Sequence, residues 1–130
     1  MAGKYWFGKN VKTGYAESVE GATAALAREG FGVLTTIDVA ATLKKKLGKE
    51  VPPYVILGAC NPEFAHQALE MEPQIGALLP CNVVVREERG GQVRVEIMDP
   101  KAVLQLVDRP EIASIAAEVR ARLERVLSAL

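Results

Sequence analysis

The fold class depends on residues 81–98, which read CNVVVREERGGQVRVEIM. The two arms of this stretch are rich in β-branched side chains, and the Gly90-Gly91 pair between them is a signal for a tight turn. In the second arm, apolar and charged residues alternate, which is typical of a strand in a sheet with one face toward solvent. Residues 81–88 and 92–98 therefore predict an antiparallel hairpin.

The flanking sequence predicts further strands and helices in alternation. Three more strands are expected at residues 4–11, 31–37 and 54–59. Helices are expected at 15–30, 39–47, 62–72, 100–107 and from 110 onward. Strict alternation would favour a parallel doubly wound sheet, but the hairpin breaks it. We therefore predict one α+β domain over residues 1–130, with a five-stranded antiparallel sheet and helices packed on one face.

Composition narrows the classes of function. The 130 residues carry 16 basic and 16 acidic side chains, whereas nucleic-acid binding leaves a basic footprint. No stretch approaches the roughly 20 apolar residues of a membrane span. Two cysteines without a signal peptide indicate a cytoplasmic protein with free thiols, and only seven Asn and Gln residues point toward a thermophilic source.

A candidate site follows from the order of the strands. If the strands at 54–59, 81–88 and 92–98 are antiparallel neighbours in that order, three of their ends lie at one end of the sheet. Those ends carry two Cys-Asn steps, Cys60-Asn61 and Cys81-Asn82, and also Asp99. Two helices would begin there, and helix N-termini attract anions. We predict a ligand-binding edge at this point, with no cofactor and no catalytic assignment.

Each member of this edge also has a structural interpretation. Asn61 and Asp99 precede prolines and can simply cap helices, and free cysteines are commonly small buried side chains. His66 could be the base that activates Cys60 as a nucleophile, or it could pair with glutamates on the helix surface. A zinc site built from Cys60, Cys81, His66 and Asp99 has suitable ligand types but no known spacing.

Three segments resemble a known family: Gly30–Val39, Tyr54–Pro62 and Leu79–Val85, together with Met98-Asp99-Pro100. In these segments the chain is similar to the small prokaryotic proteins of domain of unknown function family 302. The resemblance implies a TATA-binding-protein-like β-α-β4-α arrangement, with residues 39–47 and 62–72 as helical insertions. A shared fold does not imply DNA binding, and the resemblance implies no catalytic residues.

Three functions remain open at this point. The first is a non-enzymatic module that binds a small apolar or weakly anionic molecule at the Cys60–Cys81–Asp99 edge. The second is a homodimeric assembly module, because the apolar stretches 75–79 and 103–107 exceed what the layout needs and exposed apolar patches mark interfaces. The third is a thiol- or metal-dependent enzyme that uses Cys60 or Cys81.

Overall fold

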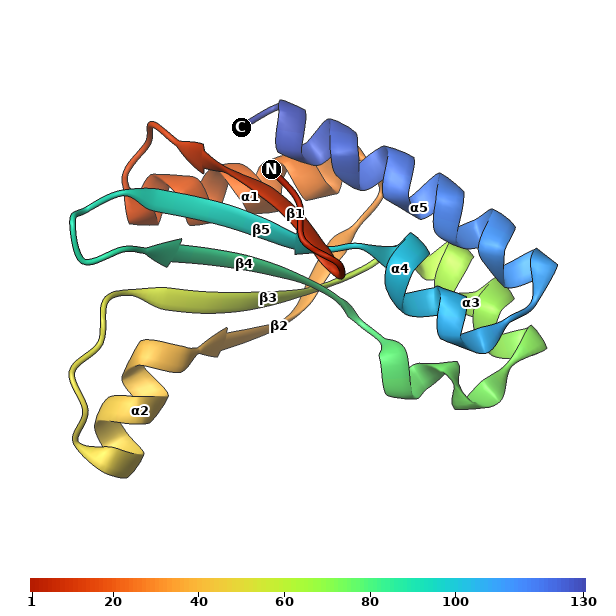
Figure 1. Ribbon diagram of the computed structural model, residues 1–130, viewed down its shortest axis with the longest axis horizontal. Coiled ribbons are helices and arrows are strands. Elements are labelled where there is room, and N and C mark those ends of the chain that lie inside the picture. Colours follow the sequence, from red (N-terminus) through yellow and green to blue (C-terminus); the bar gives the residue numbers. More distant parts are fainter.

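The computed structural model describes all residues 1–130 and contains one antiparallel sheet of five strands (Figure 1). The strands lie in the order β1-β5-β4-β3-β2. Their bounds are β1 Trp6–Val11, β2 Gly32–Asp38, β3 Tyr54–Cys60, β4 Cys81–Glu87 and β5 Val93–Met98. The predicted antiparallel α+β fold is confirmed, and so is the neighbour order β3-β4-β5 on which the candidate edge depended.

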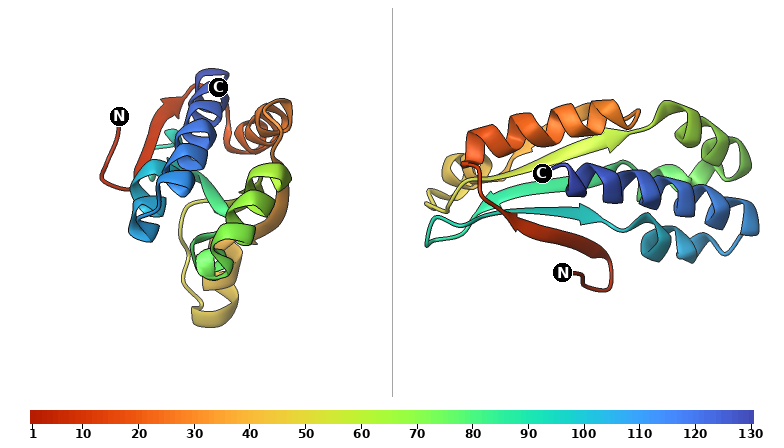
Figure 2. Two further views of the ribbon diagram at one scale, coloured as in Figure 1. Left: turned by 90° about the vertical axis from the view of Figure 1, so that its right-hand side faces the viewer. Right: turned by 90° about the horizontal axis from the view of Figure 1, so that it is seen from above.

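The helices alternate with the strands along the chain. They are α1 Tyr15–Arg28, α2 Val39–Leu47, α3 Pro62–Met71, α4 Pro100–Leu104 and α5 Pro110–Ser128, with 3-10 helices η1 Pro73–Leu78 and η2 Gln105–Val107. Helices α1 and α5 pack on one face of the sheet, while α3, η1 and α4 gather beyond one of its ends (Figures 1 and 2). None of the helices combines the length and apolar character needed to cross a membrane.

The local signals explain where these elements begin and end. Asp38 caps α2 by accepting a hydrogen bond from the amide of Ala41 at 2.8 Å, and Gly48 ends α2 in the left-handed region. Gly91 has a φ of 93° in the hairpin turn, a value that favours glycine. Strand β1 starts two residues later than predicted, because residues 1–3 fold back along it. The helix predicted at 100–107 continues as a 3-10 turn after α4.

The core lies between the inner face of the sheet and the helices α1 and α5. Along β4 and β5 the inward residues are almost fully buried, whereas the outward residues include Arg86 and Glu96, in agreement with the alternation in the sequence. Burial of aliphatic side chains contributes roughly 1.5–3 kcal/mol each. The largest fully buried side chains are Leu26, Leu57, Ile75, Ile97, Ile112, Leu123, Val83, Val85, Val95, Val126 and Pro100.

The two edges of the sheet differ. Residues 1–3 pair with the outer side of β1, through an Ala2–Phe7 bridge and a hydrogen bond from the Gly8 amide to the Met1 carbonyl at 3.0 Å. The outer side of β2 makes no such bonds, and most of its side chains are exposed. One edge is therefore partly covered by the chain itself, and the other is open.

Candidate functional site

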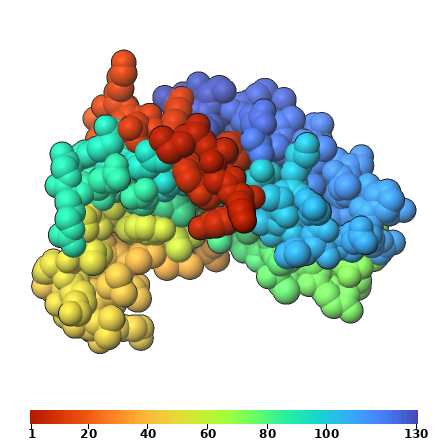
Figure 3. All heavy atoms as spheres, viewed as in Figure 1, coloured from red at the N-terminus to blue at the C-terminus, as the bar shows by residue number.

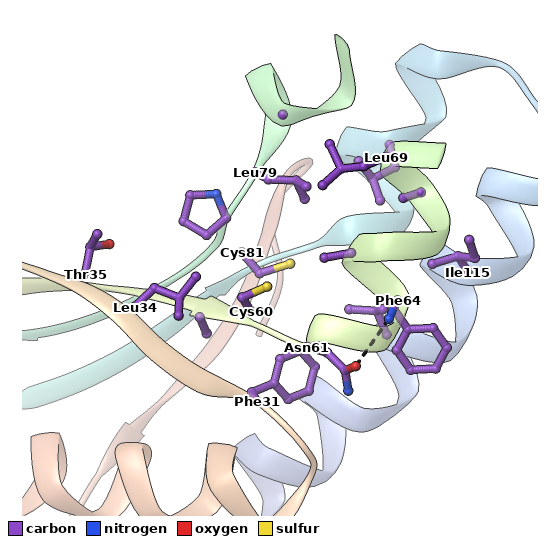
Figure 4. A pocket seen from close by; sticks show the side chains of 17 residues that line it. Phe31, Leu34, Thr35, Cys60, Asn61, Phe64, Leu69, Leu79, Cys81 and Ile115 are labelled. Carbon is purple, nitrogen blue, oxygen red and sulfur yellow. Dashed lines mark hydrogen bonds between the residues drawn. The ribbon is translucent and has the colours of Figure 1, made fainter. Parts of the chain in front are cut away.

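An apolar cavity lies where β3 ends and β4 begins (Figure 4). It has a volume of about 350 Å³ and is bounded by β2, α3, η1 and α5. Thirteen of its 17 lining residues are hydrophobic: it is lined by Phe31, Leu34, Thr35, Ala59, Cys60, Asn61, Phe64, Ala65, Ala68, Leu69, Gly76, Leu79, Pro80, Cys81, Leu104, Ile115 and Val119. A cavity of this size and character suits a small apolar molecule.

The two cysteines both line this cavity, and their thiols lie near one another in Figure 4. The register explains this, because Cys81 pairs with Ala59, the neighbour of Cys60. Burial, together with the nearby Cys60 thiol, raises the pKa of Cys81 from 9.0 to about 11. Burial also raises the pKa of Cys60. Both thiols are therefore neutral near pH 7, which makes them apolar lining and poor nucleophiles.

Asn61 also lies in the wall of the cavity and is almost fully buried. Its side-chain oxygen caps α3 by accepting a hydrogen bond from the Phe64 amide at 3.3 Å, as the Asn-Pro step predicted. Its Nδ2 atom donates no hydrogen bond within the protein and lies against Gly30. A Cβ atom at Gly30 would lie only 3.0 Å from Nδ2, and Gly30 has a φ of 87°. The side-chain amide of Asn61 therefore faces the Gly30 backbone, and its oxygen serves the start of α3.

The other predicted site residues lie outside the cavity. The imidazole of His66 is at the surface, 3.0 Å from Glu70 on the next turn of α3. Asp99 caps α4 through the Lys101 amide at 2.9 Å and forms an ion pair with Arg120. Asn82 is exposed, one step along β4 from the inward-facing Cys81. No group of three or more His, Cys, Asp or Glu side chains is placed to hold a metal ion.

On the outward side of the sheet, β4 and β5 carry a compact charged cluster. Arg86 forms a two-point ion pair with Glu96 at 2.7 and 2.9 Å, and the nearly buried Arg94 donates to the same carboxylate at 3.0 Å. Burial alone would raise the pKa of Glu96, but the hydrogen bonds from the two arginines outweigh it and lower the pKa below 4.5. This cluster is saturated internally and offers no free charge to a ligand.

Comparison with known proteins bears on the whole chain. Residues 7–130 match the model of a family described as a domain of unknown function, DUF302. The chain belongs to the DUF302 family. It is also similar to the crystal structure of an uncharacterized conserved DUF302 protein from Bacillus stearothermophilus, with 32% sequence identity and a TM-score of 0.89 over 96% of this chain and 97% of that one. No curated protein matches the chain.

Membership in the DUF302 family confirms the resemblance found in the sequence, but it assigns no activity. The prediction from the sequence missed the apolar walls of the cavity. The available signal was the apolar face of α3, where Phe64, Ala65, Ala68 and Leu69 recur at helical spacing. That face points toward the strand ends because α3 begins directly after β3.

Proposed function

We propose that this DUF302 protein is a non-enzymatic binding module for a small, uncharged, mainly apolar molecule. The observation that carries the proposal is the cavity at the Cys60–Cys81 end of the sheet, whose volume falls at the lower end of the range of small-molecule pockets, roughly 300–1,000 Å³. The cavity opens to solvent on one side, and its wall is almost entirely apolar. Filling it with a ligand would recover both apolar burial and van der Waals contact.

The charges around the cavity favour a neutral ligand over an anionic one. Arg122, whose guanidinium lies 5.0 Å from the centre of the Phe64 ring, already donates to Glu118 and to the carbonyl of Glu29. Arg109 donates to the carbonyl of Met71 and to Glu72. A carboxylate in the cavity would therefore lack a free cation, and burying it unpaired is costly.

The thiols support binding more than catalysis. A nucleophilic cysteine needs a lowered pKa and an adjacent base. The pKa values of Cys60 and Cys81 are both raised. The only histidine, His66, pairs with Glu70 at the surface. We therefore assign the two thiols to the lining of the binding cavity.

The test uses N-phenyl-1-naphthylamine, an uncharged aromatic probe whose fluorescence rises in apolar surroundings. We expect saturable binding to the wild-type protein and a higher Tm, since a ligand that binds only the folded state stabilises it. Ala65→Phe places a ring in the cavity and should abolish binding. Gln67→Phe adds the same ring to the exposed side of α3 and should leave binding unchanged. Absence of saturable binding to the wild type, or equal loss in both variants, would contradict the proposal.

A panel of matched alkyl alcohols and fatty acids separates neutral from anionic ligands in the same thermal-shift assay. We expect the alcohols to raise the Tm more than acids of equal chain length. The reverse order would show that a cation serves the cavity and would refute the preference for neutral ligands.

A further inference from the structure

Helix α2 is a projecting arm of the molecule. It projects from the end of β2 at the lower left of Figure 1, and none of its nine residues is buried. Val39, Leu43 and Leu47 nevertheless recur every four residues, and Leu47 is 66% exposed. Isolated helices shorter than about 12–15 residues are marginal in water. Val39 and Leu43 are half-buried beside Val51, Pro52 and Tyr54 of the same chain. The stripe is therefore only partly covered, and Leu47 at its end has no partner.

Strand β2, which leads into α2, has the same character. It is the open edge of the sheet, its residues 32–37 carry no charge, and Leu34 and Ile37 are 68% and 49% exposed. An uncharged open edge is a template for pairing with another strand. Leu34 and Thr35 also belong to the wall of the cavity. The open edge and the cavity are therefore continuous.

We propose that two copies of this chain pair antiparallel through their β2 edges, and that α2 of each copy covers the cavity of the other. Antiparallel pairing about a two-fold axis sets the end of β2 in one copy beside the start of β2 in its partner. The cavity lies next to the start of β2, through Phe31 and Leu34. The apolar stripe of α2 would thus reach the open side of the second cavity. This inference rests on the proposed function only for the role of that cavity.

The shape of the molecule fits this arrangement. In Figure 3 the lower outline is notched between the lobe formed by α2 and its following loop and the lobe formed by η1. A half-turn about an axis through β2 carries the α2 lobe of one copy into the notch of the other. A protrusion and a hollow on the same edge are what a self-complementary interface requires.

The charges fit as well. Residues 39–53, which form the arm, contain four lysines and one glutamate. Residues 61–80, which form α3 and η1 on the far side of the notch, contain three glutamates and no lysine or arginine. Glu72 is paired with Arg109, so Glu63 and Glu70 supply the acidic rim. Because a second copy supplies both surfaces, each arm would face an acidic rim. Complementary charges of this kind fix orientation and partner choice.

A charge exchange tests the pairing. In the arm variant, Lys45→Glu and Lys46→Glu reverse the arm, and in the rim variant, Glu63→Lys and Glu70→Lys reverse α3. All four side chains are exposed. We expect light scattering to give twice the 14.0 kDa chain mass for the wild type and the single-chain mass for each variant alone. A mixture of the two variants should recover the double mass, because both interfaces of the mixed pair are then complementary.

The control carries Lys4→Glu and Lys12→Glu, two exposed lysines flanking β1, and should pair like the wild type. A wild-type protein of single-chain mass, or a mixture that stays at single-chain mass, would overturn the pairing. Recovery in the mixture also proves that both variants are folded.

The cover is tested with N-phenyl-1-naphthylamine on the same samples. We expect the separated variants to bind the probe about tenfold more weakly than the mixture, which corresponds to about 1.4 kcal/mol of lost apolar contact. Equal affinity of the separated variants and of the mixture would overturn the proposal that α2 covers the partner's cavity. A wild-type protein of double mass that binds no probe would contradict the proposed function and leave the pairing supported. A wild-type protein of single-chain mass that binds the probe saturably would contradict the pairing and leave the proposed function supported.

Discussion

Cys81 should be one of the least reactive thiols that a folded protein offers. In a Cys60→Ser variant it is the only cysteine, so its alkylation can be followed without ambiguity. In the wild type its pKa is raised from 9.0 to about 11, mainly by burial and to a lesser degree by Cys60, so burial keeps the pKa raised in this variant. Only the thiolate is alkylated, and at pH 8 the thiolate fraction falls from about a tenth to about a thousandth over that shift, so the rate should fall about a hundredfold. Burial of the sulfur slows the reaction further.

The assay is labelling with iodoacetamide followed by intact mass, with the same variant unfolded in guanidinium chloride as the reference. The native rate should still be rising with pH at pH 10, whereas the unfolded rate should level off above pH 9. The Cys81→Ser variant reports Cys60, which is only partly buried and should react faster than Cys81. If native Cys81 reacts at the unfolded rate, or if its rate levels off below pH 9, the argument that burial raises its pKa is refuted. The hypothesis of a thiol-dependent enzyme would then be favoured.

The same shift links stability to pH. The folded pKa of Cys81 lies above its ordinary value, so the neutral thiol contributes its full stability below pH 9 and loses it as the pH rises toward 11. A pKa shift of about two units corresponds to roughly 3 kcal/mol. Relative to Cys81→Ser, the protein with Cys81 should therefore weaken by up to about that amount in alkali, measured by guanidinium unfolding. A pH-independent difference between the two would contradict the linkage.

Four other substitutions probe the core, the cap of α3 and the charged cluster on the outer face of the sheet, all by chemical unfolding followed by circular dichroism. Leu57→Ala, in the fully buried core, should cost about 2–5 kcal/mol, whereas Leu106→Ala, at a side chain 77% exposed, should cost less than about 0.5 kcal/mol; similar losses would argue against the assigned core. Asn61→Ala removes the cap of α3 and should cost about 1 kcal/mol; an unchanged midpoint would show that the cap is not stabilising. Glu96→Gln should lower the free energy of unfolding by roughly 1.5 kcal/mol at pH 7. Because the arginines lower the pKa of Glu96, the difference between wild type and variant should shrink as the pH falls below 4.5. A difference that stays constant down to pH 2 would show that it does not come from the ion pairs.

Much of the fold could be predicted because its local signals agree with one another. The alternation along β5, the Gly90-Gly91 turn and the Asn-Pro and Asp-Pro helix starts each indicate the element that the structure contains. The neighbour order β3-β4-β5, which the prediction of the candidate edge assumed, is also correct. The apolar residues 75–79 indicate neither a helix nor a strand, and most of them belong to η1, because a 3-10 helix has neither the helical nor the strand period.

The site was only partly accessible to the same reasoning. Sharing a sheet end does not mean sharing a cavity, since successive residues of a strand point to opposite faces. Cys81 faces inward to the cavity, and Asn82 faces outward for that reason. His66 and Asp99 instead make contacts close to them in the chain. His66 contacts Glu70, and Asp99 caps α4. The cavity walls come from α3 and η1, whose placement depends on tertiary packing.

The unequal edges of the sheet have a consequence for assembly. A sheet with two open edges can add copies at both and grow into a filament. In this protein residues 1–3 already occupy part of the outer side of β1. Joining two copies through β2 would leave only β1 of each copy, partly covered by residues 1–3, at the two ends of the combined sheet. Growth would then stop at two copies, and a short segment remote from the cavity would set the size of the assembly.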